Sequence, residues 1–418
     1  MIIPSQITKC LSVCIALSSL GAFCDSAKGE EKGSTLFREI LGPPSVPLST
    51  KVIIGEQKSL MIIETGAVDT MIDSSFRRML TLIPAKKGNN TLDGKVKGGA
   101  FYECPSIHLQ SLELLHPAVT VDDFARRSQL LGHKVSGYLG ARAFDKGKLL
   151  IAYSKNSLEF HSGPWRLSEP DFREQALVAS VPPQIECEIG NHRCKFIIGV
   201  GDAGCIYLEA SVFDVMAAEG IIESTNGEAG NASIAASPRP RGGYFIKGKL
   251  MDKDLRGMSV VSEEGVSILG DEWLCGFDSE IDFPGRQFRF RQIPGARAPV
   301  DPWTMFGAML TYDELGAKVE SLRPDGKGAA ESGGLKAGDL INSIAELKGE
   351  QLNAVTFAET IAANAGGTID VEFVRVSDGT NVKAKLKLPP SISPWNFGGR
   401  DLLNNAGAKS PSTDAKQN

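Results

Sequence analysis

The sequence predicts a mainly β protein built from two similar halves, followed by a smaller β domain with short helices. Short runs rich in Val, Ile, Phe and Tyr alternate with Gly, Asn and Asp turns, which is typical of strands joined by hairpins. Three sequence blocks also recur in the same order further along the chain, which indicates an internal repeat. The 418 residues are enough for two or three compact domains.

The bulk composition narrows the function. Hydrophobic residues make up 42% of the chain and charged residues 23%, so most of it can bury a core. Lys plus Arg total 45 against 50 Asp plus Glu, a net charge of -5 that gives no electrostatic basis for binding nucleic acid. The histidines show no metal-ligand spacing and the cysteines form no Cys-x-x-Cys pair, so we expect no metal and no cofactor.

Residues 1–24 have the features of a secretory signal peptide. Lys9 provides the positive start, and the apolar run at residues 10–24 is shorter than the roughly 20 residues that a spanning helix needs. Residues 22–24 (Ala-Phe-Cys) form an acceptable cleavage site, and a retained membrane anchor is the alternative. We therefore expect a secreted or periplasmic protein with no stable membrane span after signal removal.

The internal repeat organises the chain up to about residue 292. We assign residues 40–162 to the first repeat and residues 180–292 to the second. A short helix is expected in each copy, at residues 74–80 and 209–219. The matching blocks are 51–63 with 186–198, 97–101 with 241–245, and 137–160 with 267–290.

The cysteines offer one candidate disulfide. Cys187 and Cys194 flank the dipeptide Gly190-Asn191, which is a plausible two-residue hairpin turn. The two cysteines would then lie opposite each other, close enough to form a bridge in an oxidising compartment. Two buried thiols are the alternative.

The most informative string is residues 62–73, Ile-Ile-Glu-Thr-Gly-Ala-Val-Asp-Thr-Met-Ile-Asp. It resembles the active-site loop of retropepsin-like and pepsin-like aspartic proteases, in which two apolar residues lead into Asp-Thr-Gly-Ala. Two such copies in one chain resemble a bilobal aspartic protease. The resemblance covers about residues 40–292 and implies a two-lobed fold with a central cleft.

This family uses two facing carboxylates that share one proton, one as base toward water and the other as acid toward the substrate carbonyl. Glu64 stands at the first catalytic Asp position, and in the gap-free alignment Gly199 stands at the second. A rival alignment, shifted by three residues, makes Asp202 the second acid. The resemblance thus implies Glu64 and Asp202 as the candidate catalytic pair, in a site that the gap-free alignment makes defective.

Two site assignments keep an alternative. Glu64 is either a residual acid or a polar residue that caps a loop at the end of a strand. Gly98 and Gly99, with their counterparts Gly242 and Gly243, lie either in flap-like hairpins over the cleft or in ordinary turns.

Residues 330–344 resemble the PDZ pattern, in which a small residue and Gly-Leu are followed by Gly-Asp-x-Ile-x-x-Ile. We assign residues 303–389 to this PDZ-like β-barrel with short helices, and residues 390–418 to a disordered tail. The elements expected in the barrel are strands at 317–322, 368–376 and 380–388 and a helix at 355–363.

PDZ domains bind extended peptides at a sheet edge and hold the peptide carboxylate in a loop of backbone N–H groups. Phe306, Gly307, Ala308 and Met309 stand where that loop is expected, and a core strand is the alternative. The resemblance implies a polypeptide or a protein C-terminus as the partner.

Together these features predict an aspartic-protease-like protein with a PDZ domain, catalytically impaired and acting in peptide or protein binding. The first alternative is an active, divergent aspartic endopeptidase that uses Glu64 and Asp202 and recruits substrate through the PDZ module. The second is a structural envelope protein whose repeats only form a scaffold.

Overall fold

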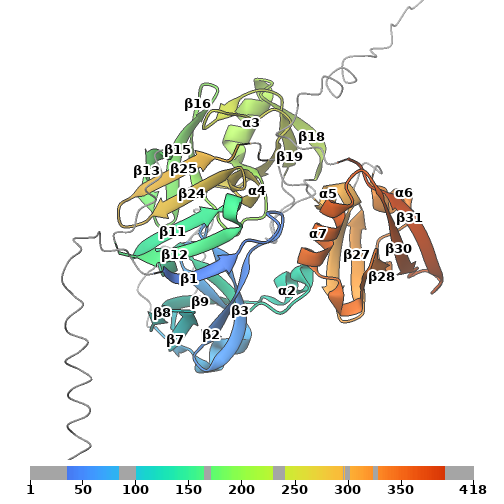
Figure 1. Cartoon of the computed structure of the whole chain (residues 1–418), viewed down its shortest axis with the longest axis horizontal. Coiled ribbons are helices and arrows are strands. Elements are labelled where there is room, and N and C mark those ends of the chain that lie inside the picture. The colour runs from blue at the N-terminus through green and yellow to red at the C-terminus, as the bar shows by residue number, and fades with distance from the viewer. Residues whose placement is uncertain are drawn as a thin grey trace, which may run out of the picture.

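The computed structural model describes residues 35–83, 100–163, 171–228, 241–294, 296, 302–322 and 328–390 (Figure 1). The expected signal peptide, residues 391–418 of the expected tail, and Gly98 and Gly99 lie outside this part of the chain. Within it the protein is mainly β, which confirms the coarse fold class. No helix of the described segments is long and apolar enough to cross a bilayer.

The sheet of the first repeat has nine strands: β2 (Ser49–Ile54), β3 (Gln57–Glu64), β4 (Thr70–Asp73), β5 (Thr81–Leu82), β6 (Tyr102–Glu103), β7 (Ser106–Leu109), β8 (Leu112–Leu115), β9 (Ala118–Asp122) and β10 (Gly137–Gly140). Their order is β5-β6-β9-β4-β10-β3-β2-β7-β8. Strand β10 lies between β3 and β4, parallel to the first and antiparallel to the second. A 3-10 helix, η1 (Ser74–Met79), follows β4 at the predicted position.

The sheet of the second repeat has eight strands: β14 (Ala179–Ser180), β15 (Pro183–Ile189), β16 (His192–Ile198), β17 (Ile206–Glu209), β18 (Ile222–Glu228), β19 (Arg241–Phe245), β22 (Ser259–Glu263) and β23 (Ser267–Leu269). Their order is β14-β15-β16-β23-β17-β22-β19-β18. The predicted helix at 209–219 is present as α3 (Ala210–Ala218). A separate two-stranded ribbon joins β20 (Lys249–Leu250) to β21 (Lys253–Asp254).

Strand pairing shows the internal repeat in three dimensions. Tyr138 of β10 pairs in parallel with Ile62 of β3, and Ile268 of β23 pairs in the same way with Ile197 of β16. In each half the strand that follows the loop, β4 or β17, pairs antiparallel with that same central strand. The first and third sequence blocks therefore occupy matching places in the two halves.

The second pair of matching blocks, residues 97–101 and 241–245, does not align with the strand pairing in the structure. Tyr102 of β6 pairs with Val119 of β9, and Gly243 of β19 pairs with Val260 of β22. Because β9 and β22 hold the same place beside β4 and β17, the counterpart of Gly243 is Tyr102. The predicted match of Gly99 to Gly243 is therefore wrong. It relied on the similar Gly-Gly pairs, which do not reflect how the strands pair with their neighbours.

A third sheet joins the two halves through six strands: β1 (Thr35–Ile40), β11 (Gly147–Ala152), β12 (Ser157–Ser162), β13 (Arg173–Ala176), β24 (Phe277–Asp282) and β25 (Gln287–Gln292). Its order is β1-β12-β11-β24-β25-β13, so β11 of the first half pairs with β24 of the second (Figure 1). The antiparallel pairing places Leu150 opposite Glu280. A largely buried ion pair between Lys148 Nζ and Asp282 Oδ2, 2.9 Å long, crosses this junction.

One apolar core runs through both halves. Strand β2 illustrates the pattern, because Val52 and Ile54 are buried while Ile53 between them is 40% exposed. Alternating side chains point to opposite faces of a strand, so this spacing buries one face and leaves the other in water. The ends of β3 and β16 are anchored in this core by Ile63 and Ile198, both fully buried.

The C-terminal unit, residues 302–390, has its own sheet and helices: α5 (Pro302–Phe306), β26 (Ala308–Asp313), β27 (Gly316–Leu322), α6 (Ala329–Ser332), β28 (Leu340–Ile344), β29 (Leu347–Lys348), α7 (Ala354–Ala363), β30 (Thr368–Val374) and β31 (Asn381–Lys387). The strand order β26-β27-β28-β30-β31 leaves β26 at one edge. The predicted strands and the predicted helix are present within two residues of their expected ends. The Asn353 side chain caps α7 by accepting hydrogen bonds from the N–H groups of Val355 and Thr356.

Candidate functional site

Two equivalent loops meet where β3 and β16 end. The Thr65 hydroxyl donates a hydrogen bond to the Ile198 carbonyl at 2.6 Å and accepts one from the Val200 N–H at 2.9 Å. The Thr65 N–H in turn donates to the Val200 carbonyl at 2.9 Å. Three hydrogen bonds between the loops therefore fix the two halves against each other at this point.

The backbone identifies which residues correspond. The N–H of Ala67 donates to the Glu64 carbonyl, and the N–H of Asp202 donates to the Gly199 carbonyl, at 3.3 and 3.2 Å. Gly199 is therefore the counterpart of Glu64, and Asp202 is the counterpart of Ala67. The three-residue shift of the rival alignment is not seen in the backbone.

The second loop is longer by one residue. Residues 64–69 in the first half correspond to residues 199–205 in the second. In the first half, the backbone N–H groups of Ala141 and Arg142 donate to the carbonyls of Ala67 and Val68, which are adjacent in the loop. In the second half the corresponding amides donate to the carbonyls of Asp202 and Gly204, which makes Ala203 the inserted residue.

The carboxyl groups of Glu64 and Asp202 nevertheless converge. A Cβ atom placed on Gly66 would lie 3.4 Å from Asp202 Oδ2 and 3.8 Å from Glu64 Oε1. A Cβ atom placed on Gly199 would lie 3.0 Å from Asp202 Oδ2. Such an atom would also lie 2.6 Å from Ile268 Cγ2, so Ile268 and Asp202 together take the space of a side chain at position 199. The two predicted acids thus approach the same place beside Gly66.

Burial and repulsion from neighbouring carboxylates raise the pKa values of this pair. Burial is the main cause that raises the pKa of Glu64 to about 7, with Arg127 opposing the rise and Asp271 adding to it. Burial also raises the pKa of Asp202 well above its usual range, and the Glu64 and Glu263 carboxylates add to that rise. Both side chains keep some exposed surface. Both carboxyl groups therefore hold a proton at higher pH than an exposed carboxyl does.

Asp271 supports the second loop through hydrogen bonds. The sequence analysis did not single it out. Its carboxylate accepts a hydrogen bond from the Gly201 N–H at 3.0 Å and another from the Tyr153 hydroxyl at 3.2 Å. It begins α4 (Asp271–Leu274), where the first repeat has Ala141 at the start of η2 (Ala141–Phe144). An acid in place of alanine within an aligned block was the available signal.

Arg127 is the second residue that the sequence did not single out. It lies on α2 (Ala125–Leu131), and its guanidinium carbon is 4.9 Å from the centre of the Phe124 ring and 5.4 Å from that of Tyr138. Its positive charge lowers the pKa of both Glu64 and Asp202. The segment that carries it has no counterpart in the second repeat, so the repeat alignment gave no signal.

The flap candidates of the second repeat lie inside a sheet. Gly242 and Gly243 are on β19, which pairs with β22 on one side and β18 on the other. A Cβ atom on Gly243 would lie 2.8 Å from the Glu223 carbonyl oxygen. These glycines therefore permit close packing within paired strands, and they do not lie in a hairpin turn.

The candidate carboxylate loop of the C-terminal unit is mostly core. Phe306 is fully buried, with its ring centre 5.2 Å from that of Phe357. The Gly307 N–H donates to the Trp303 carbonyl at 2.7 Å, which occupies one amide that a carboxylate would need. Ala308 and Met309 begin strand β26. Phe306 and Ala308 belong to the same buried cluster as Ile62 and Ala67, which flank Glu64 in the chain.

Cys187 and Cys194 face each other across the β15–β16 hairpin, as the sequence predicts. Both are free thiols in this structure, and the pKa of each is raised mainly by burial. The disulfide between them stays a prediction.

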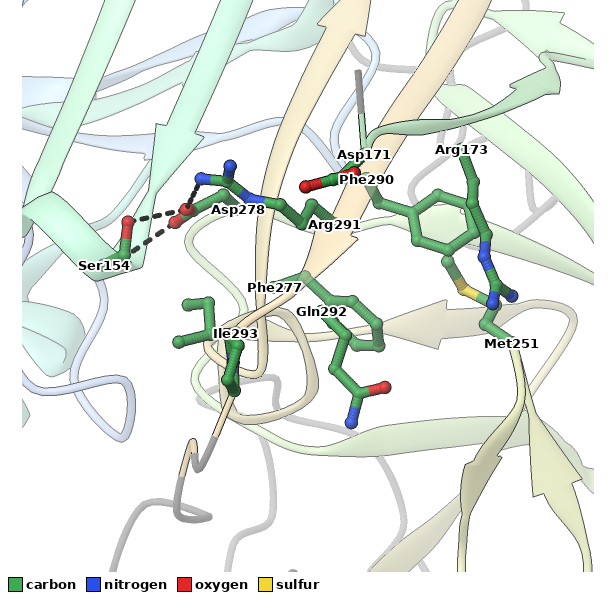
Figure 2. Close-up of a pocket in the computed structure, with 11 residues that line it drawn as sticks. Ser154, Asp171, Arg173, Met251, Phe277, Asp278, Phe290, Arg291, Gln292 and Ile293 are labelled. Atoms are coloured by element: carbon green, nitrogen blue, oxygen red, sulfur yellow. Dashed lines mark hydrogen bonds and ion pairs between the residues drawn. The ribbon is translucent and has the colours of Figure 1, made fainter. Parts of the chain in front are cut away.

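A separate hollow of about 410 Å³ lies beside β24 and β25 (Figure 2). Its apolar lining includes Phe277, Phe290 and Met251. Arg291 lies along it and is paired with Asp278 at 2.9 Å. Neither Glu64 nor Asp202 lines this hollow, so we do not place the candidate reaction there.

No protein-family model matches this chain, and a search of curated proteins finds no similar sequence. Among the residues that the structure describes, no group of three or more His, Cys, Asp or Glu side chains is arranged to hold a metal ion. The Glu64–Asp202 pair and its surroundings are therefore the candidate functional site.

Proposed function

We propose that this chain hydrolyses peptide bonds with the Glu64–Asp202 pair, in a two-lobed aspartic-protease-like fold that carries a PDZ-like C-terminal unit. The single observation that supports this proposal is the convergence of the two carboxyl groups over Gly66, one from each half of the repeat. The sequence alone favoured an impaired site, because Gly199 lacks a carboxylate. The position of the Asp202 side chain supports the active alternative, because it supplies a second carboxyl group near Glu64.

In the proposed reaction the pair holds one proton between two carboxyl groups. The ionised carboxylate takes a proton from a water molecule, whose oxygen then attacks the substrate carbonyl carbon. The protonated carboxyl gives its proton to the carbonyl oxygen, and a later proton transfer to the nitrogen releases the amine. Burial raises the pKa of Glu64 most, while Arg127 lowers it and Asp271 raises it further.

The C-terminal unit is proposed to recruit the substrate chain. Strand β26 lies at an edge of its sheet, and extended peptides bind such edges through main-chain hydrogen bonds. The proposed partner of this unit is a polypeptide. Secretion or export to the periplasm remains a prediction that rests on residues 1–24.

One observation favours a second function, peptide binding without hydrolysis. The two carboxyl groups arise from non-equivalent backbone positions, and Glu64 has one more methylene than an aspartate. Because misplacement by about 1 Å can lower a rate on the order of a hundredfold, the pair would then bind and orient a peptide without cleaving it.

The test is proteolysis of a diverse peptide mixture by the purified chain lacking residues 1–24, read by mass spectrometry from pH 3 to 8. We expect cleavage that rises as the pH approaches about 7, because Glu64 then ionises while Asp202, whose pKa lies well above its usual range, keeps its proton. Glu64→Gln and Asp202→Asn should each reduce the rate by about 100-fold or more. Asp69→Asn, a carboxylate in the same loop that pairs with Arg142, should retain cleavage.

Cleavage that persists in both pair variants would reject the proposed chemistry. If the wild type cleaves nothing above the variants at any pH, the binding function is favoured instead. Saturable binding of the same peptides to Glu64→Gln, measured by fluorescence anisotropy, would then establish it.

A further inference from the structure

The two halves differ in the connection that leads to the central strand of each sheet, β10 in the first half and β23 in the second. In the first half, residues 123–136 connect β9 to β10 and form α2. In the second half, residues 264–266 make the same connection between β22 and β23. The α2 segment, defined here as residues 124–132, is therefore an addition to the first half alone.

The α2 segment packs against the C-terminal unit (Figure 1). Leu131 belongs to the same buried cluster as residues of β26 and α7. A Cβ atom on Gly132 would lie 2.7 Å from Asn353 Cβ and 3.0 Å from Tyr312 Cβ, so the backbone approaches closely here. An ion pair between Arg126 and Glu320 of β27 adds a charged contact.

The same segment also acts on the Glu64–Asp202 pair, through the charge of Arg127. Arg127 stacks against Tyr138, whose strand partner Ile62 lies two residues before Glu64. The groups that act electrostatically on the pair are Arg127 from α2, Asp271 from α4, Glu263 from β22, Tyr138 from β10 and Tyr207 from β17. Among these named groups Arg127 is the cation.

The contact between α2 and the C-terminal unit includes an unsatisfied polar group. Tyr312 of β26 is 4% exposed, and its hydroxyl has no hydrogen-bond partner among the described residues. A buried hydroxyl without a partner costs free energy. This cost weakens the packing of the α2 segment against the C-terminal unit relative to a state in which the hydroxyl reaches water. This is independent support for a contact that can open.

We propose that the α2 segment is an internal occupant of the β26–α7 face, and that its docking there holds Arg127 as a positioning residue of the Glu64–Asp202 pair. A polypeptide that adds to the β26 edge competes with the α2 segment for this face. Its binding therefore releases α2 and moves Arg127 away from the pair. The inference rests on the proposed function, and it makes the C-terminal unit a regulator of the site as well as a recruiter.

The test compares two glycines in the full chain lacking residues 1–24. Gly132 and Gly220 both follow a helix with positive φ, +75° and +65°. A Cβ atom on Gly220 meets nothing within 4 Å, whereas one on Gly132 meets Asn353. Both alanine variants thus carry similar backbone strain, and only Gly132→Ala disturbs the contact.

Hydrogen–deuterium exchange gives the first readout. We expect peptides from the α2 segment and from β26 to exchange at least about three times faster in Gly132→Ala than in Gly220→Ala. The charge pair gives a second route: Arg126→Glu and Glu320→Arg should each loosen the same peptides, and the double exchange of charge should restore protection. Equal exchange in the two glycine variants would overturn the docking proposal.

Carbodiimide labelling of Glu64 against pH gives the second readout and needs no catalysis. Arg127→Met should move the labelling midpoint upward by about half a pH unit or more, because the lost cation no longer favours the ionised carboxylate. Gly132→Ala should move it in the same direction by less. Arg78→Met, which removes an exposed cation elsewhere, should leave it unchanged.

The two readouts separate this inference from the proposed function. A midpoint that stays fixed in Arg127→Met rejects the role of Arg127, whether or not the wild type cleaves peptides. A shift in Arg127→Met without a shift in Gly132→Ala leaves Arg127 acting on the pair but rejects its control by the C-terminal unit.

Discussion

The loops at residues 64–69 and 199–205 have nearly the same backbone and different chemistry. Both follow a central strand, and both turn with the same hydrogen bond from the fourth residue back to the first. The first carries an acid at the strand end, while the second carries Gly199 there and its acid three residues later. The backbone symmetry of the repeat is therefore kept while the functional groups are redistributed.

This difference shows that backbone equivalence does not decide where a functional group ends up. Asp202 corresponds by backbone to Ala67, yet its carboxyl occupies the space next to Gly199. A side chain at position 199 would collide with Ile268 and would crowd that carboxyl, so the glycine keeps the space free for both. The four predictions below test the comparison between the loops, in order of decreasing effect.

The largest difference is expected between two glycines in equivalent positions. Gly201 has φ of +94°, and a Cβ atom there would lie 1.8 Å from the Ile63 carbonyl oxygen. Gly201→Ala should therefore lower the free energy of unfolding by more than about 3 kcal/mol. Gly66→Ala, whose nearest contact would be 3.4 Å away, should cost less than about 1 kcal/mol. Urea unfolding at pH 6 measures both, and similar losses would contradict the asymmetry.

The hydroxyl of Thr65 is the next largest contributor. Thr65→Val should cost about 2 to 4 kcal/mol, because the buried Ile198 carbonyl and Val200 N–H both lose their partner. Val200→Thr places a second hydroxyl at the equivalent position and should change stability by less than about 1 kcal/mol. Chemical unfolding of both variants and of the double variant measures the effect. A loss below about 1 kcal/mol in Thr65→Val would mean that water replaces the hydroxyl.

The Glu64 carboxyl should make stability depend on pH. Its pKa is about 7 in the folded protein, above the value of 4.5 for an ordinary glutamate, so the folded state binds more protons between those values. Stability from this group is complete below about pH 4.5 and is lost as the pH rises to about 7. Glu64→Gln should remove that slope and leave the variant more stable than the wild type at pH 8 by about 1 to 3 kcal/mol.

Urea unfolding at pH 4.5, 6 and 8 measures the slope. Glu56→Gln, an exposed glutamate on the β2–β3 turn, is the control and should keep the wild-type pH dependence. An unchanged slope in Glu64→Gln would show that Glu64 is ionised across this range and that the pair does not share a proton.

The smallest effect on stability is expected from the hydrogen bonds that Asp271 makes with the second loop and with Tyr153. Tyr153→Phe removes the hydroxyl that donates to Asp271 and should cost about 0.5 to 1.5 kcal/mol. Asp271→Asn retains an oxygen that can accept the Gly201 N–H, and should cost a similar amount or less. Thermal unfolding of the two single variants and the double variant would show whether the losses are additive. Additive losses would contradict a shared hydrogen-bond network.

Much of the fold could be predicted from the sequence, because alternating apolar residues and turn glycines are local signals. The hairpin with Gly190 and the helix that became α3 are examples. The match of Gly99 to Gly243 failed because register depends on the neighbouring strands, which a short match does not include. The sequence predicts Glu64 and Asp202 as a candidate pair, but it could not decide whether the Asp202 side chain would reach the neighbourhood of Glu64.

The residues that tune the pair were harder to predict. Asp271 acts through a backbone amide of a loop far away in the sequence, and Arg127 acts across a connection that only one repeat has. An arginine on a short polar helix usually indicates a solvated face. Its role emerges only when the ring of Tyr138 and the C-terminal unit are seen around it.

The junction between β11 and β24 has a consequence for assembly. Leu150 faces Glu280, Lys148 faces Asp282 and Ala152 faces Asp278. Residues 150 and 280 are counterparts in the repeat, so each half offers the same strand to the other in the same register. A strand that pairs with its own counterpart in this way is self-complementary and defines an isologous contact. One half produced alone would expose that edge, and we expect two copies to associate through it as a homodimer.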